Sequence, residues 1–428
     1  MKKPKLVTLV AGSLVMNTFL MRPAALGQQY VPVSMVLGLA LVVLYFCLKG
    51  RAKSVIEKKS RLEMGFLILL VIAYWCYELP LGLLRESEEI NLAKELMSTL
   101  VIVGCYAAFL VERDANREFF RIFSTVLGLL GWSGVLTMML SQIIGLNALY
   151  LFPIHVQGYD TLSASALEGQ TTGSVYFPFS MLYSIYTAGD VELNRFSNFF
   201  REAGIYQAVS IFFFAYERFT RRSRFVTIGL AAGALLSLST LGLLLLPLTG
   251  GLVYLARRRA NIVRFAIAAA AAIAAVGILI FAPAIGLTDK LDTHSTSVTD
   301  RSYAISRGID AIVTDPLGTG VYSEKVAGYG ICLIASIASI GLIGFLIQFI
   351  LLAGFRPGER FFGPKVITCF PLFMTALLSQ PIAGAGMTYI LAMVAIPAVA
   401  GVSKPMRRFQ FVRRRHAAAR ASILDNVA

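Results

Sequence analysis

Charged residues are scarce in this sequence. Asp, Glu, Lys and Arg make up 15% of its 428 residues, whereas a soluble domain carries roughly a quarter. Hydrophobic residues reach 57%, and the mean hydropathy is +0.71. These values exclude a water-soluble globular fold.

Sequence motifs for metal-dependent or nucleotide-dependent chemistry are also lacking. HExxH, CxxC and P-loop patterns do not occur. The nearest approach to a DxD pair is Asp190-Val-Glu192, which we interpret as a solvated turn. We therefore expect no cofactor and no bound metal. The five cysteines lie in or beside apolar blocks and are expected to pack as small apolar side chains: Cys47, Cys76, Cys105, Cys332 and Cys369.

Apolar blocks are what the sequence has in abundance, and many approach the ~20 residues that cross ~30 Å of hydrocarbon. They predict an all-α polytopic integral membrane protein of about twelve spans, forming a single membrane domain over 1–428. The first block is expected to be an uncleaved span rather than a signal peptide. The expected spans are 6–21, 30–48, 63–84, 96–112, 122–145, 203–217, 225–239, 241–256, 265–284, 336–355, 366–382 and 387–403.

The positive charge has a topological pattern. The formal net charge is +15, but most Lys and Arg fall in short segments on alternate sides of the spans. Cytoplasmic loops of membrane proteins carry this excess, so the placement favours topology over nucleic acid as its explanation. It predicts that both termini are cytoplasmic, with a basic tail at 404–428.

Two extracytoplasmic loops are long, at 146–202 and 285–335. Loops beyond about 15 residues usually have a function or are disordered. Within the first loop, Val175–Ala188 is semi-apolar, and we expect a half-helix lying in the membrane interface.

Several basic residues lie in these loops, where the orientation rule disfavours them. Arg195, Arg201, Arg301 and Arg307 are candidates for binding an anion, because the planar guanidinium donates two parallel hydrogen bonds to phosphate. Alternatively, they pair with acidic side chains or lipid headgroups. Glu78, near the outer end of the third span, either helps to bind substrate or simply reaches the interface.

The densest cluster is Arg195-Phe-Ser-Asn-Phe-Phe-Arg201-Glu202-Ala-Gly204, immediately before the sixth span. Glu202 therefore lies near the amino-terminal end of a helix, where partial positive charge gathers. Its carboxylate either caps the helix, or it has a functional role and accepts a proton or binds a sugar hydroxyl.

This cluster resembles the core motif of the O-antigen polymerase and ligase superfamily. Leu236-Ser-Leu-Ser239-Thr240-Leu-Gly242 is similar to the small-polar break between two spans of that family. Arg301 with Asp315-Pro316-Leu-Gly318-Thr-Gly320 resembles the Arg and Pro-x-Gly-x-Gly of its large outer loop, and Gly341-Leu-Ile-Gly344 its Gly-x-x-Gly. The resemblance covers roughly 190–355.

Two positions depart from the family. Asn198 stands where the family usually has Gly, and Gly330 stands where its ligase branch has a His taken to be the catalytic base. His155 and His294 lie elsewhere in the loops, and we interpret them as solvated residues. The missing His favours a polymerase over a ligase.

The resemblance implies a GT-C-like fold and a polysaccharide polymerase of the Wzy type in a bacterial inner membrane. Donor and acceptor would be glycans on undecaprenyl pyrophosphate, joined at the periplasmic face without a metal. Its further implied partners are membrane lipids and a chain-length regulator protein. The implied catalytic residues are Glu202, Arg195 and Arg301; the implied substrate-binding residues are Arg201, Arg307, Ser197, Asn198, Gly204, Ser239, Thr240, Pro316, Gly318 and Gly320.

Two other functions remain open from the residues. An O-antigen ligase would transfer the finished glycan to another acceptor. A transporter or flippase of a lipid-linked glycan would share the twelve-span layout, although the sequence shows no matching halves with paired broken helices.

Overall fold

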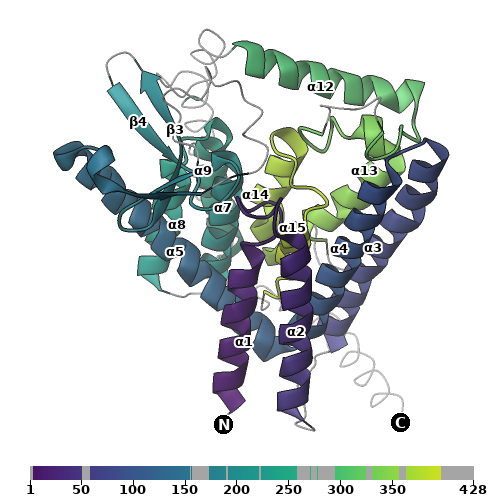
Figure 1. Cartoon of the computed structure of the whole chain (residues 1–428), viewed down its shortest axis with the longest axis horizontal. Helices are drawn as coiled ribbons and strands as arrows, with labels where there is room; N and C mark the ends of the chain where they lie inside the picture. The colour runs from purple at the N-terminus through teal and green to yellow at the C-terminus, as the bar shows by residue number, and fades with distance from the viewer. Residues whose placement is uncertain are drawn as a thin grey trace, which may run out of the picture.

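The computed structural model describes residues 3–50, 58–154, 156, 173–188, 191–220, 223–257, 270, 277, 295–323, 330–355 and 363–396. Helices dominate this part of the chain (Figure 1). They are α1 (Lys3–Thr18), α2 (Val31–Lys49), α3 (Lys58–Leu84), α4 (Glu89–Leu110), α5 (Arg113–Ile144), α7 (Ala203–Thr220), α8 (Arg224–Leu236), α9 (Thr240–Arg257), α12 (Ser295–Thr314), α13 (Ile337–Ala353), α14 (Pro364–Leu378) and α15 (Gly386–Ala392).

The expected spans compare well with these helices. Every predicted interval except 265–284 contains part of a described helix, while 265–284 lies almost wholly outside the described residues, as does the basic tail 404–428. The expected break near Leu241 is present, because α8 ends at Leu236 and α9 begins at Thr240.

Five of the described helices are long and apolar enough to cross a membrane, namely α2, α4, α5, α9 and Ser60–Leu84 of α3. The apolar side chains of α2 are largely exposed; Val36, for example, is 70% exposed. In water such a surface would be unfavourable, but in lipid it is the expected outer surface of a spanning helix. The protein is therefore built for embedding in a membrane.

Helix α7 is the centre of the helix bundle. Nearly all of its side chains are buried, and it packs against α5, α8, α9 and α14. Tilted pairs of aromatic rings join it to α5: Phe213 lies 4.8 Å from Phe123 and 6.1 Å from Phe120, measured between ring centroids. Close packing of this kind, rather than removal from water, holds helices together in a membrane, so α7 has a well-defined place.

Glycines allow α5 and α8 to approach closely. A Cβ on Gly131 would lie 1.9 Å from the carbonyl oxygen of Gly229, and one on Gly229 would lie 2.3 Å from that of Gly128. The Gly229-x-x-x-Gly233 pattern is thus a packing surface, as small residues at helix interfaces in membranes commonly are.

The first long loop contains a small antiparallel sheet, in the order β1-β2-β3-β4. The half-helix expected over Val175–Ala188 is therefore wrong. Pro178 interrupts any helix there, and the following Tyr-Ser-Ile-Tyr-Thr run favours a strand. The elements are the short 3-10 helix η1 (Asn147–Leu149) and the strands β1 (Tyr150–Pro153), β2 (Ser174–Tyr176), β3 (Ser180–Ala188) and β4 (Val191–Phe196).

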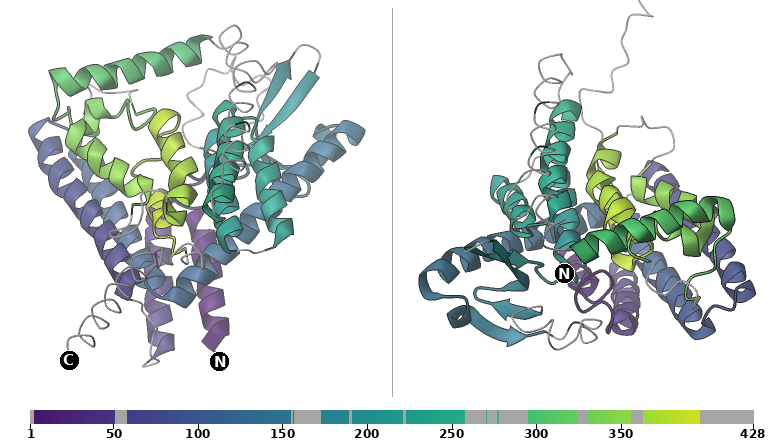
Figure 2. Two further views of the ribbon diagram at one scale, coloured as in Figure 1. Left: turned by 180° about the vertical axis from the view of Figure 1, so that it is seen from behind. Right: turned by 90° about the horizontal axis from the view of Figure 1, so that it is seen from above.

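The described parts of both long loops lie at the same end of the bundle. Figure 1 shows α12 lying across this end, with β3 and β4 beside it, while α1 begins at the opposite end. Seen from above, the sheet and α12 cover different parts of the bundle (Figure 2). The expected candidate residues therefore share one face of the molecule.

Candidate functional site

The segment between β4 and α7 is a tight turn that leads into the central helix. Asn198 and Phe199 have φ angles of +42° and +68°, a left-handed conformation in which Gly and Asn are favoured. Asn198 is fully buried; its Oδ1 accepts from the N–H of Met181 (3.2 Å) and its Nδ2 donates to the carbonyl of Leu130 (3.1 Å).

The departure at Asn198 therefore has a structural explanation. The backbone needs a residue that tolerates positive φ, and Asn supplies it while its amide ties the turn to β3 and α5. Both ends of this amide are engaged with the protein. Asn198, which was expected to bind substrate, is thus held in the turn by both ends of its amide.

Arg195 joins two of the sequence motifs. Its Nε donates to the carbonyl of Ser237 at the end of α8 (3.0 Å), and its guanidinium lies 5.1 Å from the centre of the Tyr183 ring. Leu238 and Ser239 follow, and α9 begins at Thr240. The small-polar break between two spans is therefore held against β4.

Glu202 lies immediately before α7, as the sequence predicts. Its carbonyl accepts from the N–H groups of Ile205 and Tyr206 (3.1 and 3.2 Å). Its side chain is half-buried, and its carboxylate makes no hydrogen bond to the residues that the structure describes. The backbone of Glu202 thus starts the helix, while the carboxylate lies where the helix dipole is positive.

The short loop between α1 and α2 is the feature that sequence reasoning missed. Ala24 pairs with Phe200, and the carbonyl of Pro23 accepts from the N–H of Arg201 (3.2 Å). The carbonyl of Arg22 accepts from the N–H of Met387 at the start of α15 (3.2 Å). This loop therefore holds the start of α7 and the start of α15 together.

Arg22 continues this connection towards the second long loop. Its guanidinium donates to Glu95 of α4 (3.1 Å), which also accepts from the Tyr322 hydroxyl (3.2 Å). Burial alone would lower the pKa of Arg22, but the charge of Glu95 and the Tyr322 side chain hold it above the ordinary value. Burial raises the pKa of Tyr322, and Glu95 raises it further.

Glu78 also contacts the second loop. It is fully buried in α3, and its Oε1 accepts from the N–H of Val321 (2.8 Å). Of the two interpretations left open, a carboxylate reaching the interface does not fit this burial. In the sequence, the only indication that Glu78 has such a contact was that carboxylates are rare inside membrane spans.

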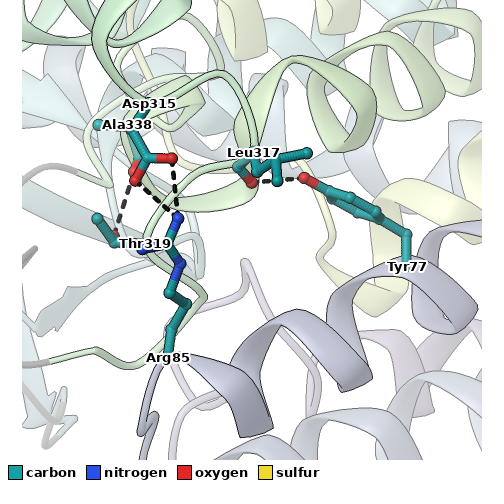
Figure 3. A network of polar contacts seen from close by, with 6 residues as sticks. All are labelled: Tyr77, Arg85, Asp315, Leu317, Thr319 and Ala338. Carbon is teal, nitrogen blue, oxygen red and sulfur yellow. Dashed lines mark hydrogen bonds and ion pairs between the residues drawn. The ribbon is translucent and has the colours of Figure 1, made fainter.

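The Asp315–Gly320 segment packs against α3 and the start of α13 (Figure 3). Arg85 pairs with Asp315 (3.0 Å), and Tyr77 donates to the carbonyl of Leu317. Gly318 and Gly341 have φ angles of +83° and +65°, and a Cβ on Gly341 would lie 2.2 Å from the Leu317 oxygen. Two further motifs therefore dock on each other, backbone against backbone.

Pro316, Gly318 and Gly320 were expected to bind substrate, and here they shape this docking. The carbonyl of Pro316 accepts from the N–H of Leu342 (2.8 Å), and the N–H of Gly320 donates to Ser339 (2.9 Å). A Cβ on Gly320 would lie 2.7 Å from the Ser87 hydroxyl. Glycine is required at 318 and 320 because neighbouring atoms leave no room for a Cβ at either position.

Helix α12 carries the remaining two arginines. Arg301 is partly exposed and lies close enough to Cys332 to influence its thiol electrostatically. Arg307 is exposed, with its guanidinium 5.7 Å from the centre of the Tyr303 ring. Ala304 and Gly308, on the buried side, pack on the 331–335 segment.

The predicted site residues thus form two groups at one end of the bundle. Arg195, Ser197, Asn198, Arg201, Glu202 and Gly204 lie around the start of α7, with Ser239 and Thr240 beside them; Arg301, Arg307, Pro316, Gly318 and Gly320 lie on the second loop. No contact recorded among the described residues joins Arg301 directly to Glu202. Within that same part of the chain, no group of three or more His, Cys, Asp or Glu is placed to hold a metal ion.

No protein-family model, curated protein or solved structure matches this chain.

Proposed function

We propose that this protein is a polysaccharide polymerase of the Wzy type. It joins undecaprenyl-pyrophosphate-linked oligosaccharide units at the periplasmic face of a bacterial inner membrane. In this proposal the chain spans the bilayer twelve times in a GT-C-like arrangement, with both termini in the cytoplasm. Its partners are the lipid-linked donor and acceptor, the surrounding lipids and a chain-length regulator.

One observation carries the proposal: the hydrogen bond from Arg195 to the carbonyl of Ser237 (3.0 Å). It brings together two motifs of the resemblance that are separated by about forty residues and by two membrane helices. The contact lies at the end of β4, seven residues before Glu202 in the chain, and this arrangement supports the proposal.

The reaction can be written with the residues in hand. The acceptor hydroxyl attacks the anomeric carbon of the donor, the bond from that carbon to the pyrophosphate oxygen breaks, and lipid pyrophosphate leaves with the electron pair. Glu202 accepts the hydroxyl proton. Arg195, Arg201 and Arg301 supply positive charge where the leaving oxygens become more negative.

The first test uses the full chain in nanodiscs with the lipid-pyrophosphate repeat unit of its host, without nucleotide or metal. We expect a ladder of lengthening glycans and release of lipid pyrophosphate, resolved on a gel. Transfer to a different acceptor without a ladder would indicate a ligase instead. Movement of the lipid across a liposome bilayer, with no new glycosidic bond, would show that the protein is a transporter and not a polymerase.

The proposed orientation is tested by labelling with a membrane-impermeant thiol reagent. In a variant without the five native cysteines, Ser302→Cys on α12 is expected to react in spheroplasts, whose inner membrane is intact. Arg117→Cys on α5 should react only after the membrane is opened; both positions are exposed. The reverse labelling pattern would invert the topology.

A further inference from the structure

Gln207 is a buried amide in the central helix. Its side chain is 1% exposed, and neither Oε1 nor Nε2 has a hydrogen-bond partner among the described residues. Burying an unsatisfied polar group costs free energy, and α7 could hold Leu at this position without that cost. The amide is therefore poorly explained by the packing alone.

A second amide lies one helical turn away, on the same side of α7. A Cβ on Gly204 would lie 3.1 Å from Nε2 of Gln380, which is 4% exposed and whose Oε1 also lacks a partner among the described residues. Gln207 is three residues after Gly204, and residues three apart share a face of a helix. Two incompletely satisfied amides thus lie along the first two turns of α7, Gln380 beside Gly204 and Gln207 beside Gly242 of α9.

Residues of α7, α9 and the end of α14 surround these two amides. A Cβ on Gly242 would lie 1.9 Å from Cδ of Gln207, so the first turn of α9 lies directly against the amide. Gln380 comes just after α14. Further from the loops, Ile211 of α7 packs with Ala234 and Leu245 in an apolar cluster. The amides therefore lie between this cluster and the end of α7 that carries Glu202.

We propose that Gln207 and Gln380 form a neutral subsite that binds hydroxyl groups of the acceptor sugar. The inference rests on the proposed function and names a substrate contact between one and two turns along α7 from Glu202. Gln207 follows Glu202 by five positions, which is roughly 7–8 Å along the helix axis and about 140° around it. This separation is comparable to the width of one sugar ring.

The chemistry of the pair selects a sugar rather than a phosphate. Each amide presents both a carbonyl acceptor and an NH₂ donor, and a hydroxyl group needs one of each. Phosphate offers acceptors only and is preferred by charged donors. The arginines beside Glu202 hold the pyrophosphate of the donor, and the amides hold the neutral ring of the acceptor.

The test compares Gln207→Leu and Gln380→Leu with the unmodified full chain in nanodiscs. The probe is the soluble oligosaccharide repeat released from the host glycan, and inorganic pyrophosphate is the charged comparison. Both variants should have a Tm equal to or above that of the unmodified chain, because an unsatisfied polar group is removed. The Tm increase caused by the oligosaccharide should disappear, while the increase caused by pyrophosphate remains.

Kinetics supply a second readout. In the polymerisation assay, we expect each variant to raise the KM for the acceptor about tenfold or more, with kcat changed less than threefold. Gln348→Leu is the matched control: Gln348 is a buried Gln of α13 whose Oε1 also lacks a partner among the described residues, but whose Nε2 donates to the Tyr389 hydroxyl (2.8 Å). It should lower the Tm and leave the KM unchanged.

Each outcome has one meaning. A marked loss of Tm or of folding in Gln207→Leu overturns the subsite, because the amide would then serve the fold. An unchanged KM and an unchanged response to the oligosaccharide also overturn it, while a ladder from the unmodified chain leaves the proposed function intact. Oligosaccharide binding that depends on Gln207 but produces no ladder supports the subsite and overturns the polymerase.

Discussion

Glu202→Gln is expected to reduce the polymerisation rate by about 10²–10⁴-fold, the usual contribution of a general base. The substitution keeps the size of the side chain and the backbone carbonyl that starts α7. Folding should therefore be nearly unaffected, with a loss of at most about 1 kcal/mol from the helix dipole. The measurement is the single-turnover rate of glycan transfer, with protein levels and Tm determined in parallel.

The matched control for this prediction is Glu89→Gln. Glu89 is an exposed carboxylate and the first residue of α4, so it lies near a helix start, as Glu202 does, without the place of Glu202 beside the α7 turn. We expect normal chain length from Glu89→Gln. Normal chain length from Glu202→Gln at equal protein levels would remove Glu202 from the catalytic residues.

Gly341→Val is expected to destabilise the protein by about 2–5 kcal/mol. A side chain at positive φ costs roughly 1–2 kcal/mol, and overpacking against the Leu317 carbonyl adds about 1–3 kcal/mol. The second loop would no longer pack on α3 and α13, so polymerisation should also fail. Thermal unfolding and limited proteolysis at the second loop measure the two effects.

Two other substitutions serve as controls for this prediction. Gly330→Ala introduces a Cβ that meets nothing within 4 Å and should change stability by less than about 0.5 kcal/mol. Arg85→Ala removes a partly exposed ion pair with Asp315, which contributes about 0–1 kcal/mol. If Gly341→Val unfolds at the same temperature as these controls, the contact between the two glycine motifs has no structural importance.

Periodicity and charge were sufficient to locate most helices, because a spanning segment must satisfy its backbone within itself. The break at Leu236–Thr240 was predictable because small polar residues interrupt an apolar run. The sheet was not predictable in the same way. Its strands are defined by pairing partners such as Ser174 and Leu182, and the strength of that pairing cannot be judged from one segment alone.

The candidate site was predictable only in outline. The resemblance identified Arg195 and Glu202, but not the Ser237 carbonyl that accepts the hydrogen bond from Arg195. Arg22 was noticeable only as a basic residue on the outer side, and its carboxylate partner Glu95 lies 73 residues away. Buried amides such as Gln207 carry no signal in an apolar span, because their importance depends on the lack of a partner among the residues that the structure describes.

The loop between α1 and α2 has a consequence for the order of biosynthesis. Its Ala24 and Pro23 contact the turn before α7, and its Arg22 contacts the start of α15. The ribosome makes this loop among the first segments, whereas α15 is the last helix described. The two contacts therefore form at different times, and the loop between α1 and α2 gains its last backbone contact only when α15 joins the bundle. Premature termination before Gly386 would leave a membrane-inserted chain in which Arg22 lacks its Met387 contact.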